Sequence, residues 1–153
     1  MTITREQKSD YKNHRFYYEG VSFALPDGYY LDTNYGDGAE DALDFWTKDM
    51  SLRIRIAIEH ETKGPLQELN SVIRDLEECV VMEGPEANIL NGLAGYRAIY
   101  DTGRRQYCEM RYAVSGADDN QTELMLLFIG DPKLPSKEVL LGLVGIIMPR
   151  KEL

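Results

Sequence analysis

Residues 52–59 read LRIRIAIE, and this stretch decides the fold class. Four large apolar residues alternate in it with charged or small ones: Leu52, Ile54, Ile56 and Ile58. When apolar residues recur with a period of two, successive side chains lie on opposite faces of a β-strand. The stretch therefore predicts a strand with one buried face and one charged face.

Two further segments show the spacing of helices that pack on a sheet. Over residues 65–80, apolar side chains recur every three or four positions, and Pro65 suits a first helical turn. Ser136 begins a second such segment, which Pro149 ends. We therefore expect two main helices, over residues 65–80 and 136–148, each with one apolar stripe.

The remaining apolar segments predict strands joined by short turns. These strands are expected at residues 16–18, 21–25, 29–31, 43–47, 87–91, 95–100, 106–114 and 123–129. Residues 123–129 are apolar at nearly every position, which is typical of a central strand covered on both faces. Because hairpin-length links imply antiparallel pairing, we expect an α+β domain with an antiparallel sheet of about six to eight strands. The domain covers residues 14–150, and a polar arm covers residues 1–13.

The predicted opening hairpin carries the pattern F-x-x-x-G-x-x-F-x-x-P-x-G, at Phe16, Gly20, Phe23, Pro26 and Gly28. A G-x-x-G element, Gly92 and Gly95, then leads into a predicted strand, and a predicted apolar helix closes the domain. These motifs and the order of the elements resemble the PsbP/Mog-like fold, whose members include the extrinsic PsbP subunit of photosystem II and the Ran-binding Mog proteins. The resemblance spans about residues 14–150 and implies a scaffold for partner binding rather than for chemistry.

The composition is that of a folded globular protein with an acidic surface. Of the 153 residues, 43% are hydrophobic and 28% are charged, as in ordinary soluble proteins. A chain of this length can bury a core without help from disulfides or metals. A net charge of −9 disfavours nucleic acid and anionic membranes as partners. No apolar run approaches the length of a membrane span. Because residues 1–13 have no apolar h-region, we expect a cytoplasmic chain as given, with export after removal of a leader as the alternative.

Few residues show the patterns of catalytic or metal sites. The two histidines, His14 and His60, have no neighbouring ligand, so no metal site is expected. Cys79 and Cys108 belong to no CxxC pair, so we expect two buried reduced thiols, with one disulfide in an exported protein as the alternative. Cys108 falls on a predicted core face, which disfavours a Cys–His nucleophile. We expect no enzyme activity, no catalytic residue and no cofactor.

Residues 32–44 predict an acidic loop rich in Gly and Asp. It fails the EF-hand pattern, because Gly36 stands at the fifth position and Leu43 at the twelfth. With Glu40, Asp41 and Asp44 nearby, an adventitious calcium site still remains open.

Crowded aromatic residues are the unusual feature of the sequence. Five of the ten tyrosines lie within residues 17–35, and the single tryptophan, Trp46, follows. One interpretation is that they fill core and edge positions of twisted strands. The other is a binding patch beside the acidic loop, because Tyr and Trp bury large areas while keeping a polar group. The residues proposed for that patch are Tyr30, Tyr35, Asp37 and Trp46.

A charged outer sheet face is the second candidate site. It comprises Arg53, Arg55, Glu59, Tyr107, Glu109 and Arg111. If their strands are neighbours, these charges pair across the sheet and simply stabilise it.

These observations favour a non-catalytic accessory or binding domain that recognises a protein partner through the aromatic and acidic loop. The alternative is a small-ligand carrier or small enzyme with a pocket between sheet and helix. A filled core with an exposed aromatic patch would favour the first, and a deep pocket with perturbed polar groups the second. A third possibility is a homodimer formed by pairing of two sheet edges.

Overall fold

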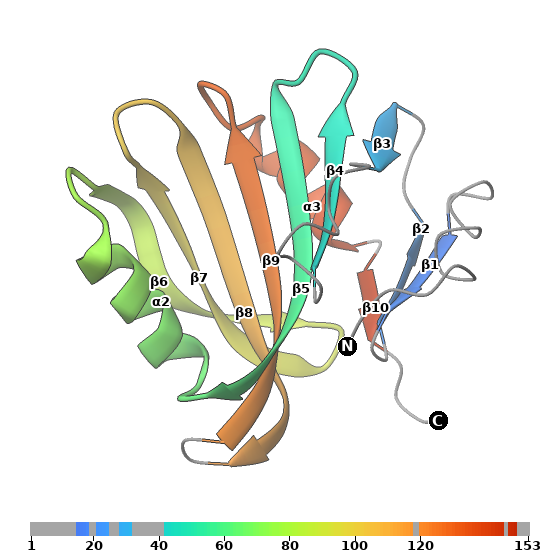
Figure 1. Ribbon diagram of the computed structural model, residues 1–153, viewed down its shortest axis with the longest axis vertical. Coiled ribbons are helices and arrows are strands. Elements are labelled where there is room, and N and C mark those ends of the chain that lie inside the picture. The colour runs from blue at the N-terminus through green and yellow to red at the C-terminus, as the bar shows by residue number, and fades with distance from the viewer. Residues whose placement is uncertain are drawn as a thin grey trace.

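The computed structural model describes residues 15–18, 21–24, 28–31, 42–117, 120–145 and 147–149. These residues form two antiparallel sheets and two helices (Figure 1). The larger sheet has seven strands in the order β3-β4-β5-β9-β8-β7-β6, and the smaller has three in the order β1-β2-β10. The expected antiparallel α+β architecture is thus confirmed.

The bounds of the elements are as follows. The larger sheet contains β3 (Tyr29–Leu31), β4 (Ala42–Thr47), β5 (Leu52–Thr62), β6 (Val80–Leu90), β7 (Leu93–Asp101), β8 (Gln106–Ala117) and β9 (Asn120–Gly130). The smaller sheet contains β1 (Arg15–Tyr18), β2 (Val21–Ala24) and β10 (Ile147–Pro149). The helices are α2 (Pro65–Asp75) and α3 (Lys137–Gly145).

β9 occupies the centre of the larger sheet, as its apolar sequence predicts. It pairs with β5 on one side and β8 on the other. Leu124, Leu126 and Phe128 belong to the main core on one face, and Met125 packs with Leu127 on the other. A strand buried on both faces needs an apolar residue at almost every position, which explains the pattern.

The main core lies between the larger sheet and α3, which is behind the sheet in Figure 1. Leu140, Leu143 and Val144 of α3 contribute to it. The sheet contributes Phe45, Leu52, Ile54, Ile56, Ile58, Leu90, Ile99, Cys108, Met110, Tyr112, Leu124, Leu126 and Phe128. The isoleucines of residues 52–59 therefore point inward, as their alternation predicts.

α2 packs on the opposite, front face of the sheet, across β6, β7 and β8 (Figure 1). Its Leu69 is fully buried there. Pro65 stands in the first turn, as expected from the sequence. The two helices thus cover opposite faces of one sheet.

Both predicted helices are too long at their C-terminal ends. α2 ends at Asp75 rather than residue 80, because Leu76 is extended and Glu78 has a positive φ of 54°. Val80, which continues the helical spacing, instead pairs with Asp101 on β7, and Val81 pairs with Tyr100. Pairing of β-branched residues with a neighbouring strand overrides a short continuation of helical spacing.

The second helix ends at Gly145 rather than residue 148. Residues 147–149 form β10, which pairs antiparallel with β2 and closes the small sheet. Backbone hydrogen bonds of a strand here replace the expected last helical turn. The sequence contains no signal for this pairing, because the two strands lie more than 120 positions apart.

The tight packing of β7 against β8 at Gly95 predicts a sharp contrast between two glycines. A Cβ at Gly95 would lie 2.0 Å from the Arg111 carbonyl oxygen on β8, so Gly95→Ala should cost about 1–3 kcal/mol. A Cβ at Gly142 in α3 would meet nothing within 4 Å, so Gly142→Ala should stabilise by about 0.5–1 kcal/mol. Urea unfolding of both variants checks this. Equal effects would contradict the described packing of β7 on β8.

Candidate functional site

Two of the four expected patch residues lie directly opposite each other. β3 pairs with β4 so that Tyr30 stands across from Trp46. Tyr30 is 52% exposed and Trp46 is half-buried, whereas Phe45, on the other face of β4, is fully buried in the core. The alternation along β4 thus separates a core aromatic from a surface aromatic. Tyr35 and Asp37 lie outside the described residues, as do the carboxylates of the calcium interpretation other than Asp44.

An arginine completes this aromatic pair. In the β4–β5 pairing Arg53 stands opposite Trp46, and its Cζ lies 5.1 Å from the centre of the Trp46 ring. A guanidinium within about 6 Å of an indole face is attracted to the ring's negative face. Tyr30, Trp46 and Arg53 together are called the aromatic–arginine patch.

A buried carboxylate holds the arginine in place. Asp44, two residues before Trp46 on β4, is only 2% exposed. It accepts hydrogen bonds from Arg53 Nη2 at 2.5 Å and from Arg55 Nε and Nη2 at 2.8 and 2.9 Å. Burial would raise the pKa of Asp44, but the hydrogen bonds from Arg55 and Arg53 outweigh it and hold that pKa below its ordinary value. Asp44 therefore stays ionised and fixes both guanidinium groups.

The second candidate, the charged outer face, divides into two groups. Arg53 and Arg55 bind Asp44, a carboxylate that the sequence marks only as a possible calcium ligand. Arg111 on β8 binds Glu59 on β5, although β9 lies between these strands. β5 and β8 are thus not neighbours, yet their charges do pair across the sheet, because the Arg111 side chain spans the intervening strand.

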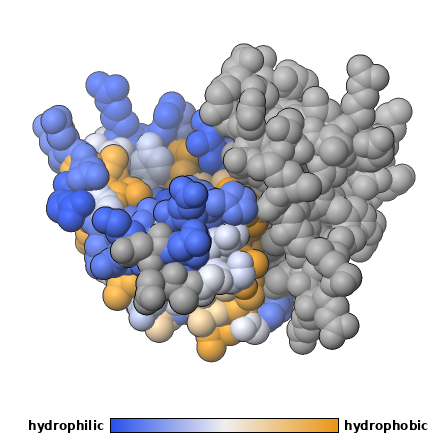
Figure 2. All heavy atoms as spheres, turned by 60° about the horizontal axis from the view of Figure 1, so that its bottom comes forward, coloured by the Kyte–Doolittle hydropathy of each residue, from blue (hydrophilic) through white to orange (hydrophobic). Residues whose placement is uncertain are grey.

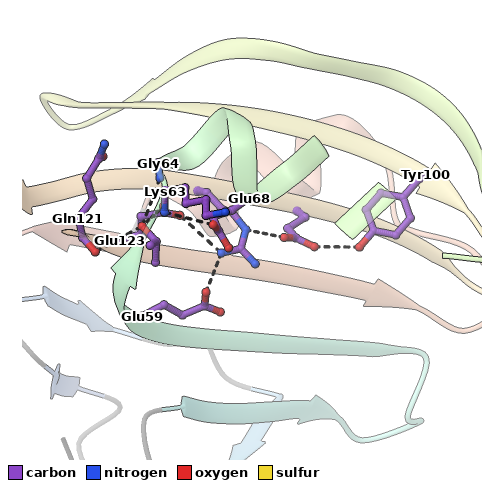
Figure 3. Close-up of polar contacts among 10 residues, drawn as sticks. Glu59, Lys63, Gly64, Glu68, Tyr100, Gln121 and Glu123 are labelled. Carbon is purple, nitrogen blue, oxygen red and sulfur yellow. Dashed lines mark hydrogen bonds and ion pairs between the residues drawn. The ribbon is translucent and has the colours of Figure 1, made fainter. Parts of the chain in front are cut away.

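Arg111 is the centre of a buried charge cluster with three carboxylates (Figure 3). Its Nη1 lies 2.8 Å from Glu59 Oε2 and 3.5 Å from Glu123 Oε1, and its Nε lies 2.7 Å from Glu109 Oε2. Glu109 and Glu123 are almost fully buried, whereas the Glu59 side chain is 37% exposed. These four residues are called the Arg111 cluster.

Hydroxyl groups bind the second carboxylate oxygens of the two buried glutamates, Glu109 and Glu123. Tyr100 Oη donates to Glu109 Oε1 at 2.9 Å, and Thr62 Oγ1 donates to Glu123 Oε2. Thr62 Oγ1 also accepts a hydrogen bond from the backbone N–H of Gly64, which directly precedes α2. The network thus ties the start of α2 to the sheet beneath it (Figure 3). The charged and hydroxyl groups of the network bind one another, as is typical of a network that stabilises the fold.

Burial controls the ionisation of Glu123. It raises the pKa of Glu123 above its ordinary value, and the hydrogen bond from Thr62 and the charge of Arg111 only partly oppose this shift. The carboxylate of Glu68 on α2 raises the pKa further.

The arrangement of Cys108 and His60 gives no support to a thiol nucleophile. Cys108 is buried in the main core, and desolvation raises its pKa to about 12. The thiol is therefore protonated at neutral pH. His60 is exposed, and its Nδ1 lies 3.3 Å from Thr122 Oγ1.

Cys79 and Cys108 are both free; Cys108 is buried as expected, but Cys79 is only half-buried. His14 lies outside the described residues.

Two of the open depressions lined by described residues lie beside α2. The larger, of about 340 Å³, is apolar and lies beside the start of α2. It is lined by Pro65, Ala87, Asn88, Ile89, Ala94, Gly95, Tyr96 and Ala113. The smaller, of about 230 Å³, is polar and is lined by Lys63, Gln67, Asn70, Ser71 and Arg74. Neither is lined by the Arg111 cluster.

Within the part of the chain that the structure describes, no group of three or more His, Cys, Asp or Glu side chains is placed to hold a metal ion. In the same residues, neither helix is long and apolar enough to cross a membrane.

Removal of the central guanidinium should be costly. Arg111→Met leaves Glu109 and Glu123 buried without their cation, so we expect a loss of about 3–5 kcal/mol in the free energy of unfolding. Glu59→Gln, at the exposed end of the same cluster, should cost less than about 1 kcal/mol. Urea unfolding at neutral pH measures both. A loss below about 1 kcal/mol for Arg111→Met would show that the cluster is not a buried unit.

The raised pKa of Glu123 predicts a specific pH dependence of stability. The native state retains the Glu123 proton at pH values where the unfolded chain, with a pKa of about 4.3, has lost it. The resulting stabilisation is present below the unfolded pKa and is lost as pH rises through the folded pKa. Glu123→Gln cannot ionise, so its stability relative to the wild type should rise with pH over that interval in thermal unfolding scans.

Asp44→Asn provides the control of opposite sign. Because the folded pKa of Asp44 is lowered, its contribution is present above the unfolded pKa and is lost as pH falls through the folded value. The Asn variant should therefore be most destabilised near neutral pH and least in acid. The same pH trend in both variants would contradict the assigned environments.

The comparisons with known proteins concern the fold alone. No protein-family model matches the chain, and no curated protein matches it. One similar solved structure is LpqN of Mycobacterium tuberculosis, a protein involved in cell envelope biogenesis; the TM-score is 0.53 at 13% identity, over 97% of this chain and 99% of LpqN. Another is a protein of Bacteroides thetaiotaomicron VPI-5482, with a TM-score of 0.50 at 13% identity over 87% of this chain. The match covers 46% of that protein, so this chain spans about half its length. The chain is therefore similar in fold to both structures.

Proposed function

We propose that this chain is a non-catalytic accessory domain that recognises a protein partner through the aromatic–arginine patch. The observation that carries the proposal is the placement of Tyr30 opposite Trp46, with the Arg53 guanidinium over the Trp46 ring. Tyr35 and Asp37 are included in the proposal on the sequence alone, from the acidic segment between β3 and β4.

The chemistry of the patch supports this proposal. Trp, Tyr and Arg are the residue types most enriched among those that dominate binding energy at protein interfaces. Each offers a large flat surface together with a hydrogen-bond donor. Asp44 holds Arg53 in its position before any partner arrives, so less side-chain entropy is lost on binding.

The fold and the cysteines support two further parts of the proposal. An antiparallel sheet with one helix on each face is compatible with the PsbP/Mog-like resemblance, whose members act mainly as partner-binding proteins. Two free cysteines are what a reducing compartment maintains, so we propose a cytoplasmic location. Export is the alternative, and the cell-envelope role of LpqN is the observation in its favour.

Affinity capture with a matched pair of variants tests the proposal. Tyr30→Ala and Leu141→Ala each remove a side chain that is more than half exposed, at 52% and 58%. Leu141 lies on α3, on the other side of the sheet from α2. We expect the wild type and Leu141→Ala to capture the same protein from native lysate, and Tyr30→Ala to reduce that capture at least tenfold, which corresponds to about 1.4 kcal/mol.

The decisive step repeats the binding measurement with the captured protein in purified form, by isothermal titration calorimetry. Equal affinity for the two variants would contradict the patch as the binding surface. The carrier alternative gives a different result. Native mass spectrometry of the purified domain would then show a bound small molecule, and no captured protein would depend on Tyr30.

A further inference from the structure

β6 forms an end of the larger sheet, at the opposite end from the aromatic–arginine patch. Within the described residues its neighbour is β7, and β3 ends the sheet at the other side. Several large apolar side chains of β6 are exposed, including Val80 at 65% and Ile89 at 72%. The space-filling view in Figure 2 shows hydrophobic residues at the surface of the protein beside hydrophilic ones. Sheet edges of this kind are the places where proteins add a further strand.

The strand divides into a protected half and an open half. Gly84-Pro85 and the register shifts beside it interrupt β6 in the middle. Proline and bulges are the devices that block pairing at an edge. The following residues 86–90 run in unbroken register against β7 to the turn at Asn91-Gly92. This half therefore presents a regular backbone edge.

An apolar groove lies beside the open half. Ala87 and Ile89 both line the depression of about 340 Å³ described above. Apart from Asn88, its lining is apolar, and four of its residues are alanine or glycine. A groove lined by such small residues accepts one branched apolar side chain. Ile89, at its rim, is a side chain of that kind.

We propose that residues 86–90 pair antiparallel with the same residues of a second copy of this chain, about a two-fold axis at Asn88. In this register Ile89 of each copy stands opposite Ala87 of the other. Each isoleucine then lies over the small-residue groove of its partner, and the two Asn88 side chains meet at the axis. One surface is thus complementary to itself, as a two-fold interface requires.

Charge favours a second copy over a charged segment of another protein. The two carboxylates of β6 are already paired, Glu83 with Lys137 at 2.7 Å and Glu86 with Arg97 at 2.6 Å. The proposed register places Glu86 opposite Leu90, so no like charges face each other. The edge therefore carries little net charge to attract a basic peptide, despite the net charge of −9 for the whole chain.

Sedimentation velocity across a concentration series tests the proposal on the full chain. The short pairing predicts a weak dimer whose mass depends on concentration, with a dissociation constant below about 1 mM. Ile89→Lys should convert it to a monomer, because the lysine would bury its charge in the apolar groove. Val80→Lys, at the protected half of the same strand, should leave the dimer intact.

A cross-link tests the register independently. In a Cys79→Ser background, Asn88→Cys should form a disulfide-linked dimer under mild oxidation, because directly opposed strand residues have Cα atoms about 4.5–5.5 Å apart. Glu86→Cys, which would face Leu90, should not. A monomeric wild type at about 1 mM would overturn the proposal. So would a dimer that Val80→Lys breaks and Ile89→Lys spares, or one that Glu86→Cys links and Asn88→Cys does not.

Discussion

The rest of the structure depends on the burial of β9 between two covered faces. Leu124, Leu126 and Phe128 join the core under α3, while Glu123 on the other face joins the Arg111 cluster beneath α2. Because β9 pairs with both β5 and β8, it sets the register of the two neighbouring strands, whose side chains contribute to both faces of the sheet. The order of the central strands therefore decides which charges meet and where each helix rests.

The two faces of the sheet use different means of attachment. α3 is held mainly by apolar contacts, with one exposed ion pair from Lys137 to Glu83. The start of α2 is joined to the sheet through Thr62 and a buried ionic network, in addition to the buried Leu69. Buried charges cost free energy unless each is paired, so this network has little tolerance for loss of Arg111. A buried charge is also paired at the end of the sheet that contains β3, β4 and β5. There the buried carboxylate of Asp44 holds the Arg53 guanidinium over the Trp46 ring at the surface.

Local patterns in the sequence predict most strands and both helix starts. The alternation of residues 52–59 and the apolar run 123–129 place β5 and β9 correctly. Burial of one face requires an apolar residue at every second position, and burial of both faces requires one at almost every position. The helix ends were wrong, because Val80 and Ile147 fit helical spacing but gain more from pairing with β7 and β2.

The candidate site was predictable only in part. Crowded aromatics marked Tyr30 and Trp46, whereas the roles of Asp44 and Arg111 depend on strand order and register, which no local pattern encodes. The most direct test of the central claim uses the single tryptophan, Trp46. Acrylamide quenching of its fluorescence in the folded wild type should be intermediate between that of free tryptophan and that of a core residue. Quenching as low as that of a core tryptophan would contradict the patch as a binding surface.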